Sequence, residues 1–355
     1  MKSNDKKRAA VHEAAPLRQS GRIGGFIPEL LAGLGFSWPV GEATSGIHEN
    51  KIDAPGCGEF IAGSYSNHVG TRNYKLYIPG GYHGQSMPLL VMLHGCTQSP
   101  DDFAAGTRMN AIAEERQCLV VYPEQAESAN GSKCWNWFKS LDQQRDQGEP
   151  SIIAGITREV IKTWHVDPRQ VFIAGLSSGG AMAVIMVATY PDLYAAAGVH
   201  SGLPYASARD LPSAMVAMKE GMGAGGAIHS TSSTSARSIP IIVFHGDRDT
   251  TVHPRNGDQI IAQWMSNAAA DRPVPEGRTS PHTTIGQGKI RNGHAYTHIV
   301  HRNGSGHAIA EQWLVHGAGH AWSGGSNRGS FTDSKGPDAG KEMMRFFSAH
   351  AQFDD

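Results

Sequence analysis

One serine lies between two glycines in a setting that could make its hydroxyl a nucleophile. Ser177 is the centre of the pentapeptide 175–179, Gly-Leu-Ser-Ser-Gly, which follows the apolar run 171–174 and precedes small residues typical of a helix. A tight turn between a strand and a helix presents a serine side chain, and glycines let the two elements approach closely. Because a serine hydroxyl is a weak nucleophile by itself, covalent catalysis also requires a base and an acid.

The predicted acid follows a later apolar run, residues 241–244. Two aspartates compete in the His-Gly-Asp-Arg-Asp segment that comes next, Asp247 and Asp249. We favour Asp249, because Asp247 directly follows a glycine and suits an Asx hydrogen bond that holds the turn. Asp247 stays open as the alternative acid.

The predicted base lies in the segment 313–322, which contains two histidines. His316 belongs to the end of an expected strand, whereas His320 follows a Gly-Ala-Gly stretch. Such a stretch would let an imidazole move between a serine and a leaving group, so we favour His320. The resulting order along the chain, serine, aspartate and histidine, is typical of a nucleophile on a strand–turn–helix element.

A tetrahedral oxyanion needs two backbone N–H donors, and losing one typically costs roughly 3 kcal/mol of transition-state stabilisation. The amide of Ser178, directly after the serine, is the first candidate. The second is expected in the His-Gly-Cys-Thr-Gln loop 94–98, which follows the apolar run 89–93, and we assign it to the amide of Cys96. The His94 side chain is expected to make structural hydrogen bonds rather than to act as a second base.

Three tryptophans lie in or near these segments. Trp135, Trp137 and Trp322 are expected either to pack in the core or to form an aromatic wall for the acyl or alcohol part of a substrate. Both alternatives stay open, and the three residues are our candidate substrate-binding side chains.

The chain has four cysteines, too few for a disulfide scaffold. Cys96 and Cys134 flank loops expected near the site, so a disulfide between them is an open alternative in an oxidising compartment. Cys118 precedes the apolar run 119–122 and is expected to be a buried thiol.

Three further histidines resemble a metal-ligand cluster at first sight. In an extended segment, however, His294 and His298 share a face while His301 points the other way, and no Cys, Asp or Glu joins them. We therefore expect no metal site, and the predicted chemistry needs no organic cofactor.

Alternating strand and helix patterns position these residues, and they predict an α/β fold with a mainly parallel sheet and helices on both faces. Two segments rich in small or turn-forming residues, 221–238 and 271–292, are expected to be loops, either plain surface or part of a lid. The expected strands are residues 72–78 at an edge, 89–93, 119–122, 171–174 and 241–244, then an antiparallel pair, 295–301 and 308–315. The expected helices are residues 103–115, 151–164, 179–190, 258–269 and 338–350.

Composition narrows the classes of partner. The 355 residues include 31 basic and 32 acidic ones, so neither a nucleic-acid groove nor an anionic membrane surface is indicated. No apolar run approaches the length of a membrane span. We expect residues 1–50 to form a partly disordered N-terminal extension without a cleavable signal peptide, and residues 51–355 to form a single catalytic domain.

Five spaced segments together resemble the esterases of the poly(3-hydroxybutyrate) depolymerase family. They are Gly-Leu-Ser-Ser-Gly at 175–179, His-Gly-Cys-Thr-Gln at 94–98, Cys-Trp-Asn-Trp-Phe at 134–138, His-Gly-x-x-Asp-x-x-Val at 245–252 and Gly-Ala-Gly-His-Ala-Trp at 317–322. The resemblance covers residues 63–347. It implies an α/β-hydrolase fold, with Ser177 as nucleophile, Asp249 as acid and His320 as base.

The same family includes feruloyl and acetylxylan esterases, so the resemblance implies the reaction more firmly than the substrate. We expect an ester of short-chain hydroxyalkanoates, polymer or oligomer, with a plant-wall ester as the alternative. Many polymer-degrading members are secreted and carry a separate polymer-binding domain. Here no export segment is visible and the sequence ends at its last expected helix, which weakens the case for insoluble granules and leaves the location open. A catalytically silent hydrolase used as a binding module is the third hypothesis, and the complete serine, aspartate and histidine set argues against it.

Overall fold

The computed structural model describes residues 58–222, 239–270 and 282–351, with the backbone alone at 267–270. All of these residues belong to one compact unit, Thr44–Asp355. The expected N-terminal extension, residues 1–50, lies outside the described residues. So do 223–238 and 271–281, which make up most of the two segments expected as surface loops or a lid.

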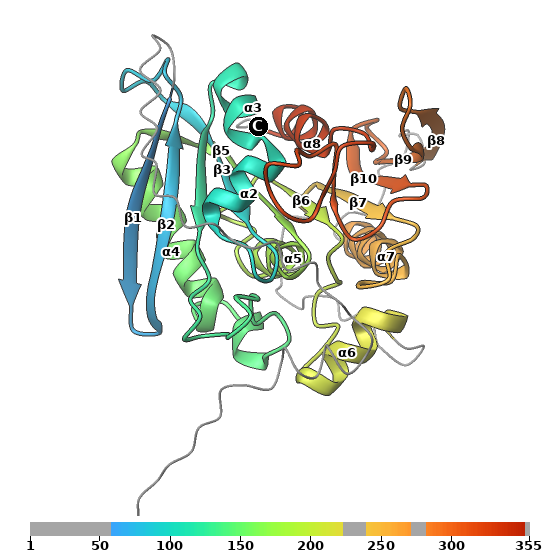
Figure 1. The fold of residues 1–355 in the computed structure, drawn as a ribbon, viewed down its shortest axis with the longest axis horizontal. Coiled ribbons are helices and arrows are strands. Elements are labelled where there is room, and N and C mark those ends of the chain that lie inside the picture. Colours follow the sequence, from blue (N-terminus) through green and yellow to red (C-terminus); the bar gives the residue numbers. More distant parts are fainter. Residues whose placement is uncertain (1–57, 223–238, 271–281, 352–355) are drawn as a thin grey trace, which may run out of the picture. The chain divides into compact units, whose positions relative to one another are not determined.

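A ten-stranded sheet runs through the described part of the chain in the order β1-β2-β4-β3-β5-β6-β7-β10-β9-β8 (Figure 1). The neighbours from β4 to β10 are parallel, whereas the strands at both edges are antiparallel. The predicted mainly parallel α/β sheet is thus confirmed. The strands are β1 (Glu59–Asn67), β2 (Gly70–Ile78), β3 (Met87–Leu93), β4 (Leu119–Pro123), β5 (Val166–Leu176), β6 (Ala196–His200), β7 (Ile241–Gly246), β8 (His282–Lys289), β9 (Ala295–Arg302) and β10 (Ala308–Val315), with β11 (Trp322–Ser323) and β12 (Thr332–Asp333) forming a separate parallel pair.

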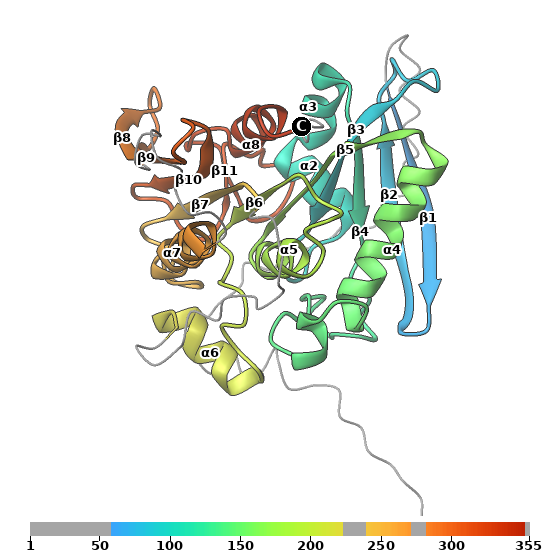
Figure 2. The same cartoon turned by 180° about the vertical axis from the view of Figure 1, so that it is seen from behind.

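Helices cover both faces of the sheet, as the alternating pattern predicts. Figures 1 and 2 show α4, α5 and α7 along one side and α2, α3 and α8 along the other. The helix α6 packs beside α7. The helices are α2 (Pro100–Thr107), α3 (Met109–Arg116), α4 (Gly148–Thr163), α5 (Ser178–Thr189), α6 (Leu211–Glu220), α7 (Arg255–Ala270) and α8 (Ala339–Ser348), and η1 (Ser140–Gln143) is a short 3-10 turn. Within the described residues, no helix is long and apolar enough to cross a membrane.

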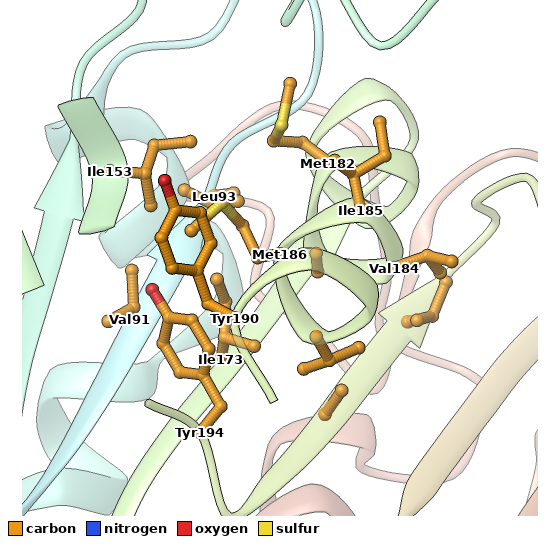
Figure 3. Close-up of a cluster of buried hydrophobic side chains, with 14 of the residues drawn as sticks. Val91, Leu93, Ile153, Ile173, Met182, Val184, Ile185, Met186, Tyr190 and Tyr194 are labelled. Atoms are coloured by element: carbon orange, nitrogen blue, oxygen red, sulfur yellow. The ribbon is translucent and has the colours of Figure 1, made fainter. Parts of the chain in front are cut away.

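Alternate residues of the central strands pack into two separate cores. In β3, Leu89, Val91 and Leu93 enter the core shared with α4 and α5, while Leu90 and Met92 enter the core shared with α2, α3 and α8. Figure 3 shows the first core, where aliphatic side chains of β3, β5 and α5 lie beside two tyrosines. Because the central strands are buried on both faces, they read as continuous apolar runs in the sequence.

Several expected elements differ from the structure for identifiable reasons. The segment 72–78 is not an edge strand, because β1 pairs along its full length with β2. The expected loop 271–292 is wrong at residues 282–289, which form the edge strand β8. Its residues are mostly exposed on both faces, so it lacks an apolar alternation and is held by backbone pairing to β9. The expected helix 103–115 is two helices, since Arg108 adopts a left-handed conformation with φ 57°.

Three elements approach to backbone contact around the turn between β5 and α5. A Cβ at Gly175 would collide with the backbone of Gly179, and a Cβ at Gly179 would collide with the carbonyl oxygen of Leu93 at the end of β3. Glycine is therefore required at both positions for steric reasons.

We predict that Gly179→Ala lowers the free energy of unfolding by at least about 2 kcal/mol, because the new methyl group would press on backbone atoms that are not free to move. Gly131→Ala is the matched control, since a Cβ there meets no atom within 4 Å; its effect should stay within about 0.5 kcal/mol. Urea unfolding of both variants measures the difference. Equal effects of the two substitutions would contradict the close approach.

Candidate active site

Ser177 occupies a strained turn between β5 and α5. Its backbone has φ 57° and ψ −118°, a conformation that a residue with a Cβ rarely adopts. The turn is held by the Ser177 amide, which donates to the carbonyl oxygen of His200 at 2.9 Å, and by the Ala181 amide, which donates to the carbonyl oxygen of Ser177 at 2.9 Å. Such strain is typical of a serine presented at the end of a strand.

Asp249 and His320 are brought together from two neighbouring parallel strands. Asp249 follows β7 and His320 follows β10, and these strands pair directly. His320 Nδ1 lies 2.7 Å from Asp249 Oδ2. Because the carboxylate only accepts, Nδ1 carries the proton, and His320 Nε2 has no hydrogen-bond partner among the described residues. This nitrogen is therefore free to take a proton.

The carboxylate of Asp249 is buried but well supplied with donors. Its Oδ1 accepts the amides of Thr251 at 2.9 Å and Val252 at 2.8 Å. Burial alone would raise the pKa of Asp249, but the imidazoles of His245 and His320 hold that pKa well below its usual range. His245 Nε2, which donates to the carbonyl oxygen of Val252 at 2.8 Å, lies 3.4 Å from Asp249 Oδ2. Asp249 is thus ionised at neutral pH.

The two residues that the sequence left as alternatives form a pair of their own. His316 Nδ1 lies 3.0 Å from Asp247 Oδ2, and the amide of Gly317 donates to Asp247 Oδ1 at 2.7 Å. The Arg248 amide adds a bond to the carbonyl oxygen of Ala318 at 3.0 Å. Asp247 therefore connects the loop after β7, which carries Asp249, to the loop after β10, which carries His320. Its contact with the second loop at Gly317 lies three residues before His320.

No hydrogen bond joins the Ser177 hydroxyl to His320 within the described residues, but both segments are bonded to one buried residue, His200. Its carbonyl oxygen accepts the Ser177 amide, and its Nε2 accepts the amide of Ser323 at 2.9 Å. The His200 ring stacks on Trp322 with centroids 5.3 Å apart. Ser177 and the segment around His320 are thus tied to the end of β6, which lies beside β5.

Of residues 95–98 in the loop after β3, three have a backbone amide with an acceptor. Gly95 N–H donates to Gln98 Oε1 at 2.9 Å, Thr97 N–H donates to the carbonyl oxygen of Ser132 at 2.7 Å, and Gln98 N–H faces the Gly95 carbonyl oxygen at 3.4 Å. Among the described residues, the amide of Cys96 has no acceptor. Of residues 95–98, it is the amide that is left to bind a ligand.

The second candidate oxyanion donor begins a helix. Ser178 is the first residue of α5, and its amide has no acceptor in the part of the chain that the structure describes, as is typical of a first helical turn. The Ser178 hydroxyl lies 3.5 Å from Cys96 Sγ. Cys96 is bonded to Cys134 in a disulfide, so its sulfur carries no proton and the hydroxyl is the donor. This contact brings the residues of both candidate amides together.

The disulfide left open by the sequence is present. Cys96 and Cys134 are bonded, which closes a segment with a sequence separation of 38 residues. The bond links the loop that carries one candidate oxyanion amide to the segment before Trp135. Cys118, by contrast, is a buried free thiol, as predicted.

Burial favours the packing alternative for the tryptophans. Trp135 is fully buried, and its indole N–H donates to the carbonyl oxygen of His94 at 3.1 Å. Trp322 is also buried, between His200 and Phe103. Trp137 has a relative exposure of 6%. In this structure the three rings stabilise the loops around the site instead of forming an open aromatic wall.

The three histidines considered as metal ligands each have a separate partner. His294 pairs with Asp333 at 2.8 Å, His298 with Glu311 at 2.9 Å, and His301 with a threonine hydroxyl at 3.0 Å. Within the described residues, no group of three His, Cys, Asp or Glu side chains is arranged to hold a metal ion.

Sequence reasoning gave no role to His200 and Gln98. His200 ends β6, a short strand of small residues that carries no strong apolar run. Gln98 belongs to the His-Gly-Cys-Thr-Gln loop, and that position was the only indication of its contact with Gly95.

We predict that the buried His200 lowers the free energy of unfolding at acidic pH. Burial lowers the pKa of His200 to about 3, whereas an unfolded histidine has a pKa of about 6.5. The unfolded chain therefore binds more protons as the pH falls from about 6.5 toward 3, and the stability that His200 provides above this window is lost within it. His200→Asn removes the titration, so its deficit in unfolding free energy should be smaller at pH 4.5 than at pH 7.5. Urea unfolding at both pH values gives the comparison, and an equal deficit would contradict it.

Comparisons with known proteins show the family to which the chain belongs. The family model described as Esterase PHB depolymerase matches residues 72–272. Poly(3-hydroxyalkanoate) depolymerase C of Paucimonas lemoignei is 29% identical over 263 residues, which cover 72% of this chain and 60% of that protein. Acetylxylan esterase A of Talaromyces purpureogenus is 26% identical over 300 residues, which cover 81% and 76%. The chain thus spans less than two thirds of the depolymerase.

A solved structure has the same fold. An acetyl xylan esterase from Aspergillus awamori matches with a TM-score of 0.62 at 20% identity, covering 81% of this chain and 99% of that one. This likeness confirms the predicted α/β-hydrolase fold. The match of the family model extends over more than half of the chain, and the chain belongs to the esterase PHB depolymerase family.

Proposed function

We propose that this protein is a serine esterase that hydrolyses short-chain hydroxyalkanoate polyesters or oligomers through an acyl-enzyme. The observation that carries the proposal is the hydrogen bond of 2.7 Å between His320 Nδ1 and the buried Asp249 carboxylate, with His320 Nε2 left unpaired in the described residues. Ser177 supplies the nucleophile from the strained turn after β5. Family membership supports the reaction class.

In the first half of the reaction, His320 Nε2 takes the proton of the Ser177 hydroxyl as its oxygen attacks the ester carbonyl carbon. Asp249 stabilises the imidazolium that forms. The amides of Cys96 and Ser178 donate to the oxyanion of the tetrahedral intermediate. His320 then protonates the leaving alcohol, and the acyl group stays on Ser177.

In the second half, the same imidazole activates a water molecule that attacks the acyl-enzyme. The acid is released and the proton returns to Ser177. Neither half needs a metal ion or an organic cofactor. The structure shows no hydrogen bond between the Ser177 hydroxyl and His320 in the described residues, and such catalytic hydrogen bonds are often long before a substrate binds.

The substrate has a second candidate class. Acetylxylan esterase A of Talaromyces purpureogenus and the poly(3-hydroxyalkanoate) depolymerase of Paucimonas lemoignei both resemble this chain. A plant-wall ester, acetyl or feruloyl, is therefore the alternative to the hydroxyalkanoate. We also propose that residues 51–355 act as one catalytic domain, and that nucleic acid is not a partner.

We predict that Ser177→Ala lowers kcat on p-nitrophenyl butyrate by more than about 10⁴-fold, because the nucleophile is lost. Asp249→Asn should lower kcat by about 10⁴-fold, since an amide no longer stabilises the imidazolium or fixes its tautomer. Asp247→Asn is the matched control and should change kcat less than about 10-fold. If Asp247→Asn causes the larger loss, the acid has been assigned to the wrong aspartate. A serine-reactive phosphonate should label Ser177, which mass spectrometry can locate.

A substrate panel separates the two ester classes. We expect kcat/KM for hydroxybutyrate oligomers to exceed that for acetylated and feruloylated xylo-oligosaccharides by at least about 10-fold. Ser177→Ala provides the background rate for every substrate. The reverse ranking would assign the protein to the carbohydrate esters, and no turnover together with no phosphonate labelling would support a silent binding module.

A further inference from the structure

We propose that His94 is a positioning residue for the oxyanion hole: its imidazole fixes the peptide between Gly95 and Cys96, whose N–H is the proposed oxyanion donor. The inference rests on the proposed function, because it concerns the same intermediate. His94 itself is buried, with a relative exposure of 1%, and does not reach a substrate.

The hydrogen-bond partners of His94 determine its tautomer. The amide of Gln125 donates to His94 Nε2 at 3.1 Å, so this nitrogen carries a lone pair. The proton is therefore on Nδ1, which donates to the carbonyl oxygen of Gly95 at 2.7 Å. Burial lowers the pKa of His94 to about 4, which keeps the ring neutral near pH 7 and preserves both bonds.

Because the peptide is planar, the hydrogen bond from His94 to the Gly95 carbonyl oxygen also fixes the direction of the Cys96 N–H. In a trans peptide the C=O and the N–H lie in one plane and point in opposite directions. The Gly95 carbonyl and the Cys96 amide belong to the same peptide, so holding the Gly95 oxygen toward His94 turns the Cys96 N–H to the opposite side. That amide has no acceptor among the described residues, as expected of a donor kept for a ligand.

The neighbouring peptides are fixed as well. Gln98 Oε1 accepts the Gly95 amide at 2.9 Å, and Gln98 Nε2 is held by Asp102 Oδ2 at 2.9 Å. The loop lies against the nucleophile, since a Cβ built on Gly95 would be 3.6 Å from the Ser177 Cβ. An amide turned away from His94 is therefore presented close to the reacting serine.

The ring of His94 is itself held rigidly. The indole of Trp135 packs beside it with centroids 5.7 Å apart and donates to the His94 carbonyl oxygen. The backbone N–H of Gln125 donates to His94 Nε2, and the side chain of Gln125 is hydrogen-bonded to Glu149 and Arg72. With both ring nitrogens occupied, His94 is not available as a second base.

Two substitutions separate the bonds of His94. In His94→Asn the side-chain amide lies near the position of Nδ1 and keeps a donor for the Gly95 oxygen. In His94→Gln the amide reaches the position of Nε2, keeping an acceptor for Gln125 and losing the Nδ1 donor. We expect His94→Gln to lower kcat on p-nitrophenyl butyrate by about 10²-fold to 10³-fold with KM changed less than about 3-fold. His94→Asn should keep kcat within about 10-fold of wild type.

Inhibition by a transition-state analogue distinguishes a positioning role of His94 from a merely structural role, which would leave the inhibition constant unchanged. Phenylboronic acid forms a tetrahedral adduct on a serine, and its inhibition constant should rise in His94→Gln by a factor similar to the fall in kcat. His301→Asn, at a partly exposed histidine of β9, is the control and should leave both quantities unchanged. Equal activity of the Asn and Gln variants, or a loss confined to KM, would overturn the proposal.

A measurement on the wild-type protein tests the proposal even if a variant does not fold. Long-range ¹H–¹⁵N NMR should find His94 protonated on Nδ1 and unprotonated on Nε2 at pH 7, and the opposite tautomer would overturn the proposal. Failure of the proposed function is distinct: the wild-type protein would then show no hydrolysis that depends on Ser177 and no phosphonate label.

Discussion

The candidate site depends on the contact of four backbone segments at one point, the ends of β3, β5 and β6 and the start of α5. Gly175 and Gly179 have no room for a Cβ there, and the Ser177 amide is bonded to the end of β6. This contact forces the reversal that leaves Ser177 in a strained conformation. It also brings the loop after β3 against the serine. The positions of the proposed nucleophile and of both candidate oxyanion amides are therefore consequences of one steric constraint, which explains why small residues are concentrated in this part of the sequence.

The proposed acid and base depend on a different contact, the pairing of the two loops that follow β7 and β10. Asp247 fastens these loops through His316 and the Gly317 amide, while Asp249 binds His320. Two Asp–His pairs from the same two loops have different roles because their environments differ. Asp249 is buried and aligned by backbone amides, whereas Asp247 is more exposed. The Gly-Ala-Gly stretch before His320 is thus anchored at Gly317 and at Ala318, which limits the positions that His320 can reach.

The sequence predicts the strands and helices whose apolar residues are buried. It does not predict strands that are formed by backbone pairing without a buried apolar pattern. The apolar runs of β3, β4, β5 and β7 mark strands buried on both faces, and Cys96, Ser177 and Asp249 of the candidate site follow three of them, β3, β5 and β7. β1, β6 and β8 were missed because their residues are exposed, or small enough to fit any element. The burial of Trp135 and the bond between Cys96 and Cys134 depend on how distant loops meet, which no local pattern records. His200 was missed for the same reason, since its role comes from partners more than 20 residues away in both directions.

The charges around the site explain where a proton can rest during the proposed reaction. Asp249 is ionised, and its pKa is held low by the imidazoles beside it. Burial keeps the pKa of His94 at about 4 and that of His200 at about 3, so neither ring competes for a proton near neutral pH. Protonating either one would bury a positive charge and break a hydrogen bond from a backbone amide to Nε2. His320 differs because its Nε2 accepts nothing in the described residues and its Nδ1 faces a carboxylate. In the proposed reaction the proton of Ser177 therefore goes to His320 and to neither of these two buried histidines, which hold backbone in place.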